Sequence, residues 1–281
     1  MPRSEILGLV CSAVLAVGLG CGASAEDRFI VVQSTTSTQN SGLFEHILPQ
    51  FTARTGIQVR VVAVGTGQAI RNAANGDGDV LFVHAREAEE AFVAEGHGVE
   101  RFDVMYNDFV IVGPPDDPAG VAGSSDAVAS LARIAAMQAP FASRGDDSGT
   151  YKAELALWNE AGIDVRSASG GWYRETGSGM GATLNTGTGM GAYILTDRAT
   201  WISFGNKAGH RIAVQGDGRL FNQYGITLAN KARHPNVKAD LGQRFIDWVL
   251  SEEGQAAIAG YQVDGQQLFF PNARARRARA A

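Results

Sequence analysis

Cysteine is almost absent from this 281-residue chain, and its two cysteines, Cys11 and Cys21, both lie near the N-terminus. The segment around them has the pattern of an export signal. One basic residue, Arg3, precedes an apolar run over residues 6–20, and residues 23–25 (ASA) offer a small-x-small cleavage site. Cleavage after Ala25 would leave a mature chain without cysteine, which excludes disulfides, a thiolate nucleophile and a thiolate metal site.

Two other interpretations of this segment stay open, namely an uncleaved anchor helix and a lipid anchor on Cys21. The apolar run is short for a bilayer span, and no comparable run follows it. Residues 18–20 (GLG), directly before Cys21, lack the large apolar residue that a lipoprotein site usually has three positions upstream. We therefore expect residues 1–25 to be a signal peptide and the mature protein to reside in the periplasm.

The chain also lacks a basic excess. Its formal net charge is −5, and loss of the leader removes one arginine and one glutamate, so the charge is unchanged. This balance gives no reason to expect nucleic acid as a partner. Residues 274–279 (RARRAR) are basic but contain no aromatic residue, and we expect a solvated tail.

No group of histidines has the spacing of a metal site, since the five are scattered along the chain. Only His84 stands at a notable place, the end of a strand-like run, and for it we expect burial or a supporting role behind the ligand contacts. No serine, histidine and aspartate can be combined into a catalytic set either. The sequence therefore predicts neither a cation site nor an enzyme.

Strand-like and helix-like segments alternate after the leader. Residues 29–32, 57–64 and 80–83 are apolar runs of strand length, and apolar residues at helical spacing lie between the first two. Pro49 stands inside that helical pattern and is expected to bend or end the helix. This repeated strand–turn–helix order predicts an α/β fold with a parallel sheet and helices on its faces.

The pattern changes at residues 109–112, where an apolar strand runs into Pro114 and Pro115. We interpret this strand as a crossing from one lobe to a second, and residues 226–229 as a strand that runs back. No long linker divides the chain. The expected architecture is two α/β lobes joined by two crossing strands, with lobe I formed by residues 26–108 plus 209–281 and lobe II by residues 109–208.

Three turns rich in small polar residues follow predicted strands and open predicted helices: residues 34–38, 65–67 and 144–150. Ligands bind at such carboxyl ends of parallel strands, and a helix N-terminus suits an anion because its N–H groups are unpaired. Serine and threonine hydroxyls add donors that rotate to fit a tetrahedron of oxygens. Each turn alone could be an ordinary helix cap; three together favour an oxyanion site.

The third turn, RGDDSGT, carries the charge. Arg144 supplies a fixed fork of donors whose charge survives burial, and Gly145 and Gly149 allow the backbone to approach a ligand closely. Asp146 and Asp147 look out of place beside an anion. We expect one of them to cap the following helix and the other to hold Arg144 in place.

The chain that contains these three turns resembles the tungstate-binding periplasmic component of bacterial ABC importers. The resemblance covers most of the mature chain and is carried by residues 35–43 (TTSTQNSGL), 64–68 (VGTGQ), 78–85 (GDVLFVHA), 141–150 (FASRGDDSGT), 171–173 (GWY), 177–181 (GSGMG) and 195–201 (LTDRATW).

This resemblance implies a type II periplasmic-binding-protein fold, no catalysis, no cofactor, and delivery of the ligand by a monomeric receptor to the membrane subunits of an ABC permease. The implied ligand is tungstate or molybdate, between which the sequence does not discriminate. Which hydroxyls of the first turn donate stays open. By position, the implied anion contacts are Thr35, Thr36, Ser37, Thr66, Gly67, Arg144, Ser148, Gly149 and Thr150.

A glycine-rich stretch contains an internal echo, with GSGMGA at residues 177–182 and GTGMGA at residues 187–192. Both copies match a loose dinucleotide pattern, but they stand too close for each to lie between a full strand and a full helix. A loop that closes over the ligand, or a helix start with close packing, is expected instead. Residues 186–189 (TGTG) depart from the family, which implies a more helical segment there.

Two alternatives remain. The Arg144 turn also resembles that of phosphate-binding receptors, in which an aspartate accepts the proton of hydrogen phosphate, and Asp146 stands at the matching place. The other alternative, an enzyme on the same fold, lacks a recognisable nucleophile and base. Calorimetry with phosphate and tungstate in competition distinguishes the two possible ligands, and turnover of a substrate would reveal an enzyme.

Overall fold

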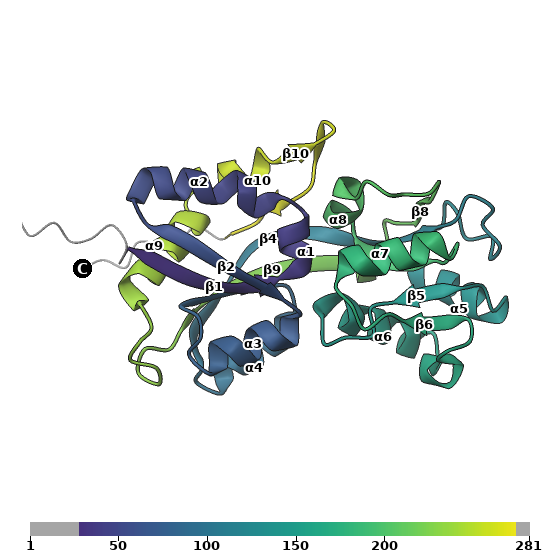
Figure 1. Cartoon of the computed structure of the whole chain (residues 1–281), viewed down its shortest axis with the longest axis horizontal. Helices are drawn as coiled ribbons and strands as arrows, with labels where there is room; N and C mark the ends of the chain where they lie inside the picture. Colours follow the sequence, from purple (N-terminus) through teal and green to yellow (C-terminus); the bar gives the residue numbers. More distant parts are fainter. Residues whose placement is uncertain (1–27, 274–281) are drawn as a thin grey trace, which may run out of the picture.

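Two lobes lie side by side in the computed structural model, which describes residues 28–273 (Figure 1). The expected signal peptide (residues 1–25), its alternative lipid site at Cys21 and the basic tail from Arg274 onward lie outside the described residues. Within the described part of the chain, no helix has both the length and the apolar character needed to cross a bilayer.

Lobe I is built on a mixed sheet with the order β12-β4-β9-β3-β1-β2. β1 pairs in parallel with β2 and β3, as the sequence predicts, whereas β9 runs antiparallel to β3. The lobe's strands and helices are β1 (Phe29–Thr35), α1 (Thr36–Asn40), α2 (Leu43–Thr55), β2 (Gln58–Val64), α3 (Thr66–Ala74), β3 (Val80–Val83), α4 (Arg86–Ala94), β9 (Phe221–Ala229), α9 (Ala239–Leu250), α10 (Glu252–Ala259), β10 (Gln262–Val263), β11 (Gln266–Gln267) and β12 (Phe270–Pro271).

Helix α2 continues through Pro49, so of the two expectations for this proline, a bend or an end of the helix, the end is wrong. Phe51, two residues after Pro49, is fully buried. Its ring packs edge-on against Phe245 and in a tilted arrangement against Trp248, both on α9. This aromatic packing stabilises the part of the helix that follows the proline, because the burial of Phe51 outweighs the loss of the one hydrogen bond that proline cannot make.

A single 16-residue strand, β4 (Gly98–Gly113), belongs to both lobes. Its first part pairs with β9 in lobe I, and its last residues pair with β7 and β8 in lobe II. β9 crosses back beside it, so the two crossing strands of the predicted fold are present. Figure 1 shows both strands bridging the lobes.

The chain returns to lobe I later than the predicted residue 209. β8 (Arg211–Val214) pairs with β4 at the lobe II end, and Ala213, Val214 and Leu220 are buried in the core of lobe II. The return therefore falls at the start of β9. A continuous apolar strand marks a crossing in the sequence, but at the start of β9 the amides Asn222 and Gln223 follow Phe221 and interrupt the apolar pattern.

Lobe II consists of β5 (Phe141–Ser143) paired in parallel with β6 (Tyr173–Glu175), β7 (Ile194–Asp197), β8, and the helices α5 (Ala127–Ala136), α6 (Gly149–Glu160), α7 (Met180–Gly189) and α8 (Arg198–Ser203). Short 3-10 turns lie at Val165–Ala168 and Gly218–Leu220. α8 is shared between the lobes, since Ala199 is buried in the lobe I core while Trp201 packs in a cluster of lobe II.

The glycine-rich stretch forms helix α7, with Gly179 as its N-cap. A Cβ on Gly187 would lie 2.5 Å from Cδ1 of Ile194 and 3.0 Å from Cβ of Ala142, so this glycine lets the helix pack directly on the strands. Of the two expectations for the stretch, the helix start with close packing is confirmed, and residues 186–189 are helical although their sequence departs from the family.

Candidate functional site

Four helix N-termini meet where the lobes face each other. Lobe I contributes the starts of α1, capped by Thr35, and of α3, preceded by Gly65; lobe II contributes the starts of α6, capped by Ser148, and of α7. Contacts across the junction show the convergence: Gly149 N–H donates to Thr66 Oγ1 over 2.9 Å, and a Cβ on Gly179 would lie 3.5 Å from Thr36 Oγ1. The partial positive charges of four helix ends thus point into one region.

Arg144 lies at the centre of this region and is only 2% exposed. It follows β5 and reaches across to lobe I, where Nη1 donates to Ser37 Oγ over 3.4 Å and Nη2 lies 3.5 Å from Thr36 Oγ1. Its Nε is buried with no hydrogen-bond partner. A buried guanidinium with long contacts and an unused donor retains capacity for an anionic ligand.

The two aspartates of this turn have different roles. Asp146 accepts from Arg144 Nη2 over 2.6 Å and from Ser148 N–H over 3.2 Å, so the predicted partnership of one aspartate with Arg144 is confirmed. The predicted aspartate cap is wrong, because Ser148 Oγ caps α6 by accepting from Tyr151 N–H. The Asp146 carboxylate is turned toward donors of its own turn.

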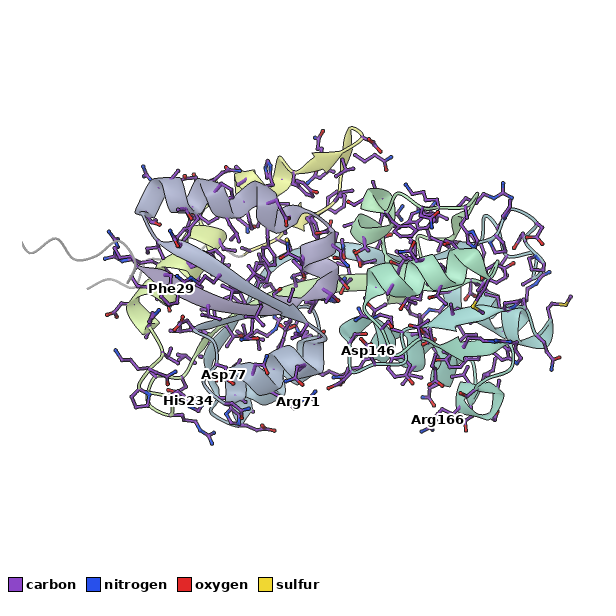
Figure 2. The ribbon with its side chains drawn as sticks, viewed as in Figure 1. Phe29, Arg71, Asp77, Asp146, Arg166 and His234 are labelled. Carbon is purple, nitrogen blue, oxygen red and sulfur yellow. The ribbon has the colours of Figure 1, made fainter. Side chains whose placement is uncertain are left out.

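Asp147 instead links the lobes. Its Oδ2 lies 2.7 Å from Arg71 Nη1 of α3, and its Oδ1 lies 2.9 Å from Lys152 Nζ of α6. These charge partners, with burial opposing them, lower the pKa of Asp147. Figure 2 shows Arg71 on lobe I close to the edge of lobe II that carries Asp146. Asp147 therefore forms an interlobe ion pair that the sequence did not reveal.

Hydroxyl groups complete the donor set. Thr36, Ser37, Thr66 and Ser148 all stand on the converging turns, and Thr66 Oγ1 and Ser148 Oγ accept backbone N–H bonds that leave their hydrogens free to donate. The hydroxyl of Thr150 is fully buried and has no partner. The sequence-predicted residues are thus brought together at one interlobe site.

Two predicted contacts donate to the protein instead of facing a ligand. Gly67 N–H donates to Asp147 O over 2.8 Å, and Gly149 N–H is taken by Thr66. A Cβ on Gly67 would fall 1.5 Å from Oδ2 of Asp147. Both glycines therefore serve the close approach of the lobes, which explains why these positions are glycine in a donor turn.

His84, at the end of β3, is a further residue of the site. Its Nε2 lies 3.2 Å from Thr35 Oγ1 and its Nδ1 lies 3.1 Å from Asn222 Oδ1. Burial, and secondarily the positive charge of Arg144, lower the pKa of His84 to about 4, so the ring is neutral at neutral pH. Its position after a predicted strand was the signal in the sequence, and the expected burial is confirmed.

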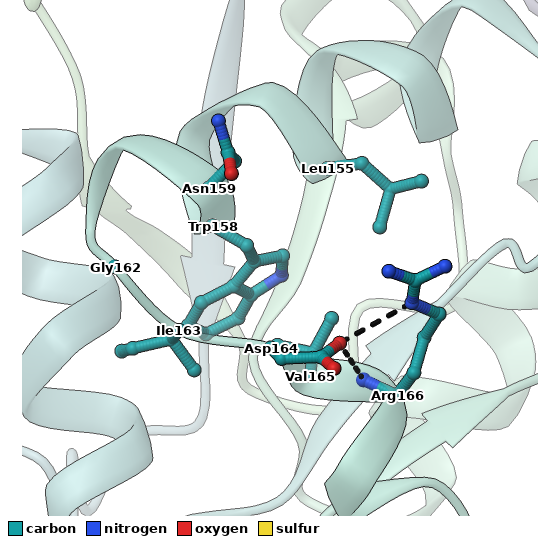
Figure 3. Close-up of a pocket in the computed structure, with 8 residues that line it drawn as sticks. All are labelled: Leu155, Trp158, Asn159, Gly162, Ile163, Asp164, Val165 and Arg166. Carbon is teal, nitrogen blue, oxygen red and sulfur yellow. Dashed lines mark hydrogen bonds and ion pairs between the residues drawn. The ribbon is translucent and has the colours of Figure 1, made fainter.

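The buried charge of Arg144 favours an anion over a cation at this site. Among residues 28–273, no group of three or more histidine, cysteine, aspartate or glutamate side chains could hold a metal ion. A separate cavity of about 500 Å³ lies in lobe II beside α6, but its charged residues Asp164 and Arg166 bond to each other (Figure 3). That cavity lacks a buried donor set like the one around Arg144.

Fold and site together define a two-lobed binding protein whose hydrogen-bond donors converge where the lobes meet. Residues 22–253 match the family model described as "PBP superfamily domain". The chain is 46% identical over 248 residues to the tungstate-binding protein TupA of Peptoclostridium acidaminophilum, covering 87% of this chain and 86% of that protein.

Two solved structures agree. The tungstate-binding protein TupA from Desulfovibrio alaskensis G20 is 44% identical with a TM-score of 0.75, covering 88% of this chain and 99% of that one. The tungstate ABC transporter structure from Geobacter sulfurreducens is 48% identical with a TM-score of 0.76, covering 83% and 98%. The chain belongs to the PBP superfamily and, within it, to the family of the tungstate-binding proteins. These relatives are named as binding and transport proteins, which supports a receptor over the enzyme alternative.

Proposed function

We propose that this protein is an exported receptor that binds tungstate between its two lobes and delivers it to the membrane subunits of an ABC permease. Its relatives' names and its fold support the receptor role. The single observation that carries the ligand class is the buried Arg144, with its unpartnered Nε, among helix N-termini and free hydroxyls. We further propose a periplasmic location and a monomeric state.

A fully deprotonated dianion fits this donor set. Tungstate and molybdate carry no proton at neutral pH, so each oxygen accepts and none must donate. Hydrogen phosphate needs an acceptor for its proton, and Asp146, the candidate acceptor, already receives bonds from Arg144 and Ser148. The size of the anion then separates tungstate from the smaller sulfate. We expect molybdate, with the same charge and nearly the same size, to compete.

Isothermal titration calorimetry on the mature, ligand-stripped protein tests this proposal. We expect tight, one-to-one binding of tungstate, competition by molybdate, and little or no displacement by phosphate or sulfate. Failure of tungstate to produce heat across a clean titration would refute the proposal, and preferential binding of phosphate would reassign the ligand.

Substitution of the charged anchor sharpens the test. Arg144→Ala should weaken tungstate binding by about 30-fold or more, because loss of a buried charged donor costs about 2–5 kcal/mol. Arg166→Ala provides the matched control, since Arg166 is an exposed arginine of the same lobe whose guanidinium pairs with Asp164, away from Asp146 and the interlobe site (Figure 2). Equal affinities of the two variants would contradict the assigned site.

A further inference from the structure

A continuous chain of polar side chains runs from the crossing strands to the first donor turn. Asn107 of β4 and Asn222 of β9 are paired neighbours where the strands cross between lobes, and Asn222 Nδ2 donates to Asn107 Oδ1 over 2.7 Å. Asn222 Oδ1 faces His84, and His84 faces Thr35. All four side chains are buried, so each bond in the chain is shielded from water.

Which atom donates in each of these hydrogen bonds follows from the Asn222 side chain. Asn222 presents its oxygen to His84 Nδ1, so Nδ1 must carry the hydrogen and donate. A neutral ring with hydrogen on Nδ1 has only a lone pair on Nε2. The contact of 3.2 Å between His84 Nε2 and Thr35 Oγ1 is therefore a bond in which Thr35 donates.

Thr35 then has no capacity left for a ligand. Its hydrogen goes to His84, and its oxygen accepts from Thr38 N–H over 3.2 Å and from the Thr38 hydroxyl over 2.8 Å. A hydroxyl has one hydrogen and two lone pairs, and all three are used. Thr36 and Ser37, the next two residues, are free of these bonds and face Arg144.

The His84 ring is itself held from both lobes. Tyr224 of β9 lies against it with ring centroids 4.8 Å apart. From lobe II, Gly149 approaches so closely that a Cβ there would lie 3.2 Å from His84 Nδ1 and 3.0 Å from its backbone oxygen. The ring thus stands at the meeting point of β3, the crossing strands and the N-terminus of α6.

We propose that His84, donating from Nδ1 to Asn222 and accepting at Nε2 from Thr35, is a positioning residue of the anion site, and this inference rests on the proposed function. It fixes Thr35 as the cap of α1, turns the Thr35 hydroxyl away from the ligand, and leaves the contacts of this turn to Thr36 and Ser37. It also ties the geometry of that turn to the crossing strands.

The tautomer is measured directly on the wild-type protein. In long-range proton–nitrogen spectra of ¹⁵N-histidine-labelled protein, protonated and unprotonated ring nitrogens have distinct shifts. We expect hydrogen on Nδ1 of His84 both without ligand and with saturating tungstate. Hydrogen on Nε2 in either state would overturn the proposal, because Thr35 would then be free to donate to the anion.

A double-mutant cycle tests whether His84 acts through Thr35. We expect His84→Gln to weaken tungstate binding by about tenfold, Thr35→Val, which also removes the cap of α1, by at least as much, and the double variant no more than Thr35→Val alone, because the bond that His84→Gln breaks is then already absent. Independent effects that multiply to about 100-fold would overturn the proposal. Thr35→Ser retains the hydroxyl and should restore wild-type affinity within about twofold.

The two proposals fail in different ways. Absence of tungstate binding by the wild-type protein would refute the proposed function, while the ligand-free spectrum would still report the His84 tautomer. If His84→Gln does not fold, the spectrum of the wild-type protein alone decides the positioning role, since it requires no substitution.

Discussion

At the scale of single residues, the buried hydroxyl of Thr150 is informative because it has no partner inside the protein. An unsatisfied buried polar group costs about 1–3 kcal/mol. Thr150 stands in the first turn of α6, two residues after the cap residue Ser148 and on the turn that carries Arg144. Its position is explained if the missing partner is a ligand oxygen.

We predict that Thr150→Val weakens tungstate binding by about tenfold and leaves the ligand-free protein as stable as the wild type or slightly more stable. Valine has nearly the same shape, and it removes a polar group that gains nothing before the ligand arrives. Calorimetry and urea unfolding measure the two effects.

Thr188→Val is the matched control, because the Thr188 hydroxyl is also buried but donates to Leu184 O within α7. It should leave the affinity unchanged. A loss of stability without a loss of affinity in Thr150→Val would contradict a ligand role for this hydroxyl.

Glu154 is another buried polar residue, on the face of α6 that points away from solvent. Its carboxyl accepts from Ser143, Trp158 and Tyr173, yet burial raises its pKa to about 7. The folded state therefore retains a proton that the unfolded chain releases between about pH 4.5 and pH 7. The contribution of this group to the free energy of unfolding falls as the pH rises through that window.

We predict that Glu154→Gln removes this pH dependence. Relative to the wild type, the variant should gain free energy of unfolding as the pH rises from 4.5 to 7, by at most about 3 kcal/mol. Urea unfolding at several pH values measures the difference. A flat difference for Glu154→Gln across this pH range would contradict the raised pKa of Glu154.

Residue chemistry was predictable where it depends on one turn. Arg144 and Thr150 were singled out because a charged fork before a helix start is visible in sequence, and Ser148 was implied by the family resemblance. The use of Gly67 and Gly149 was not, since their N–H groups bond to residues of the opposite lobe. Asp147 illustrates the same limit, because its partner Arg71 is 76 positions away and nothing local pairs them.

At the scale of elements, α7 shows how packing overrides composition. Its glycines lower helix propensity, but the helix forms because Met180 and Leu184 are fully buried against lobe II. Gly187 faces the strands and Gly189 faces open space. Position 187 is therefore glycine because the packing leaves no room for a side chain, whereas position 189 is glycine although space for a side chain is open.

We predict opposite effects of alanine at these two positions. Gly187→Ala should lower the free energy of unfolding by about 1–3 kcal/mol, because its Cβ meets Ile194 and Ala142. Gly189→Ala should raise it by up to about 1 kcal/mol, because no atom lies within 4 Å of its Cβ. Urea unfolding of both variants measures this, and equal signs would contradict the packing described for α7.

The α/β alternation and the crossing strands were predictable, since apolar runs of strand length and their separating turns are local. The lengths of elements were less so. α2 passes Pro49 because of aromatic partners on α9, and β4 extends over 16 residues because both lobes supply strands to pair with it. Such partners come from distant parts of the chain, which no window of sequence contains.

At the scale of the whole molecule, the lobes are in direct contact. Gly67 and Gly149 exchange hydrogen bonds with the opposite lobe, and the Arg71–Asp147 pair lies at the rim, with side chains 58% and 43% exposed. These bonds join the two lobes and would be lost if the lobes moved apart. Under the proposed function, in which the anion binds between the lobes, any free energy that these bonds contribute to the closed arrangement adds to ligand affinity.

We predict that Arg71→Gln raises the dissociation constant for tungstate by up to about fivefold, since an exposed ion pair contributes about 0–1 kcal/mol. The effect should shrink in high salt, which screens exposed charges. Calorimetry at two salt concentrations measures it. Arg54→Gln is the control, because Arg54 pairs with Glu253 within lobe I; a salt-independent loss, or an equal loss in the control, would contradict the interlobe role.

The route of the chain through the lobes also has a consequence for folding. Lobe II is inserted into lobe I, whose β3 pairs with β9 and whose core includes Phe245 and Trp248. Lobe II is built from neighbouring segments and can assemble from contacts that are short in sequence, whereas lobe I must close a loop of more than a hundred residues first. The edge of β3 that pairs with β9 therefore stays unpaired until the last quarter of the chain is available.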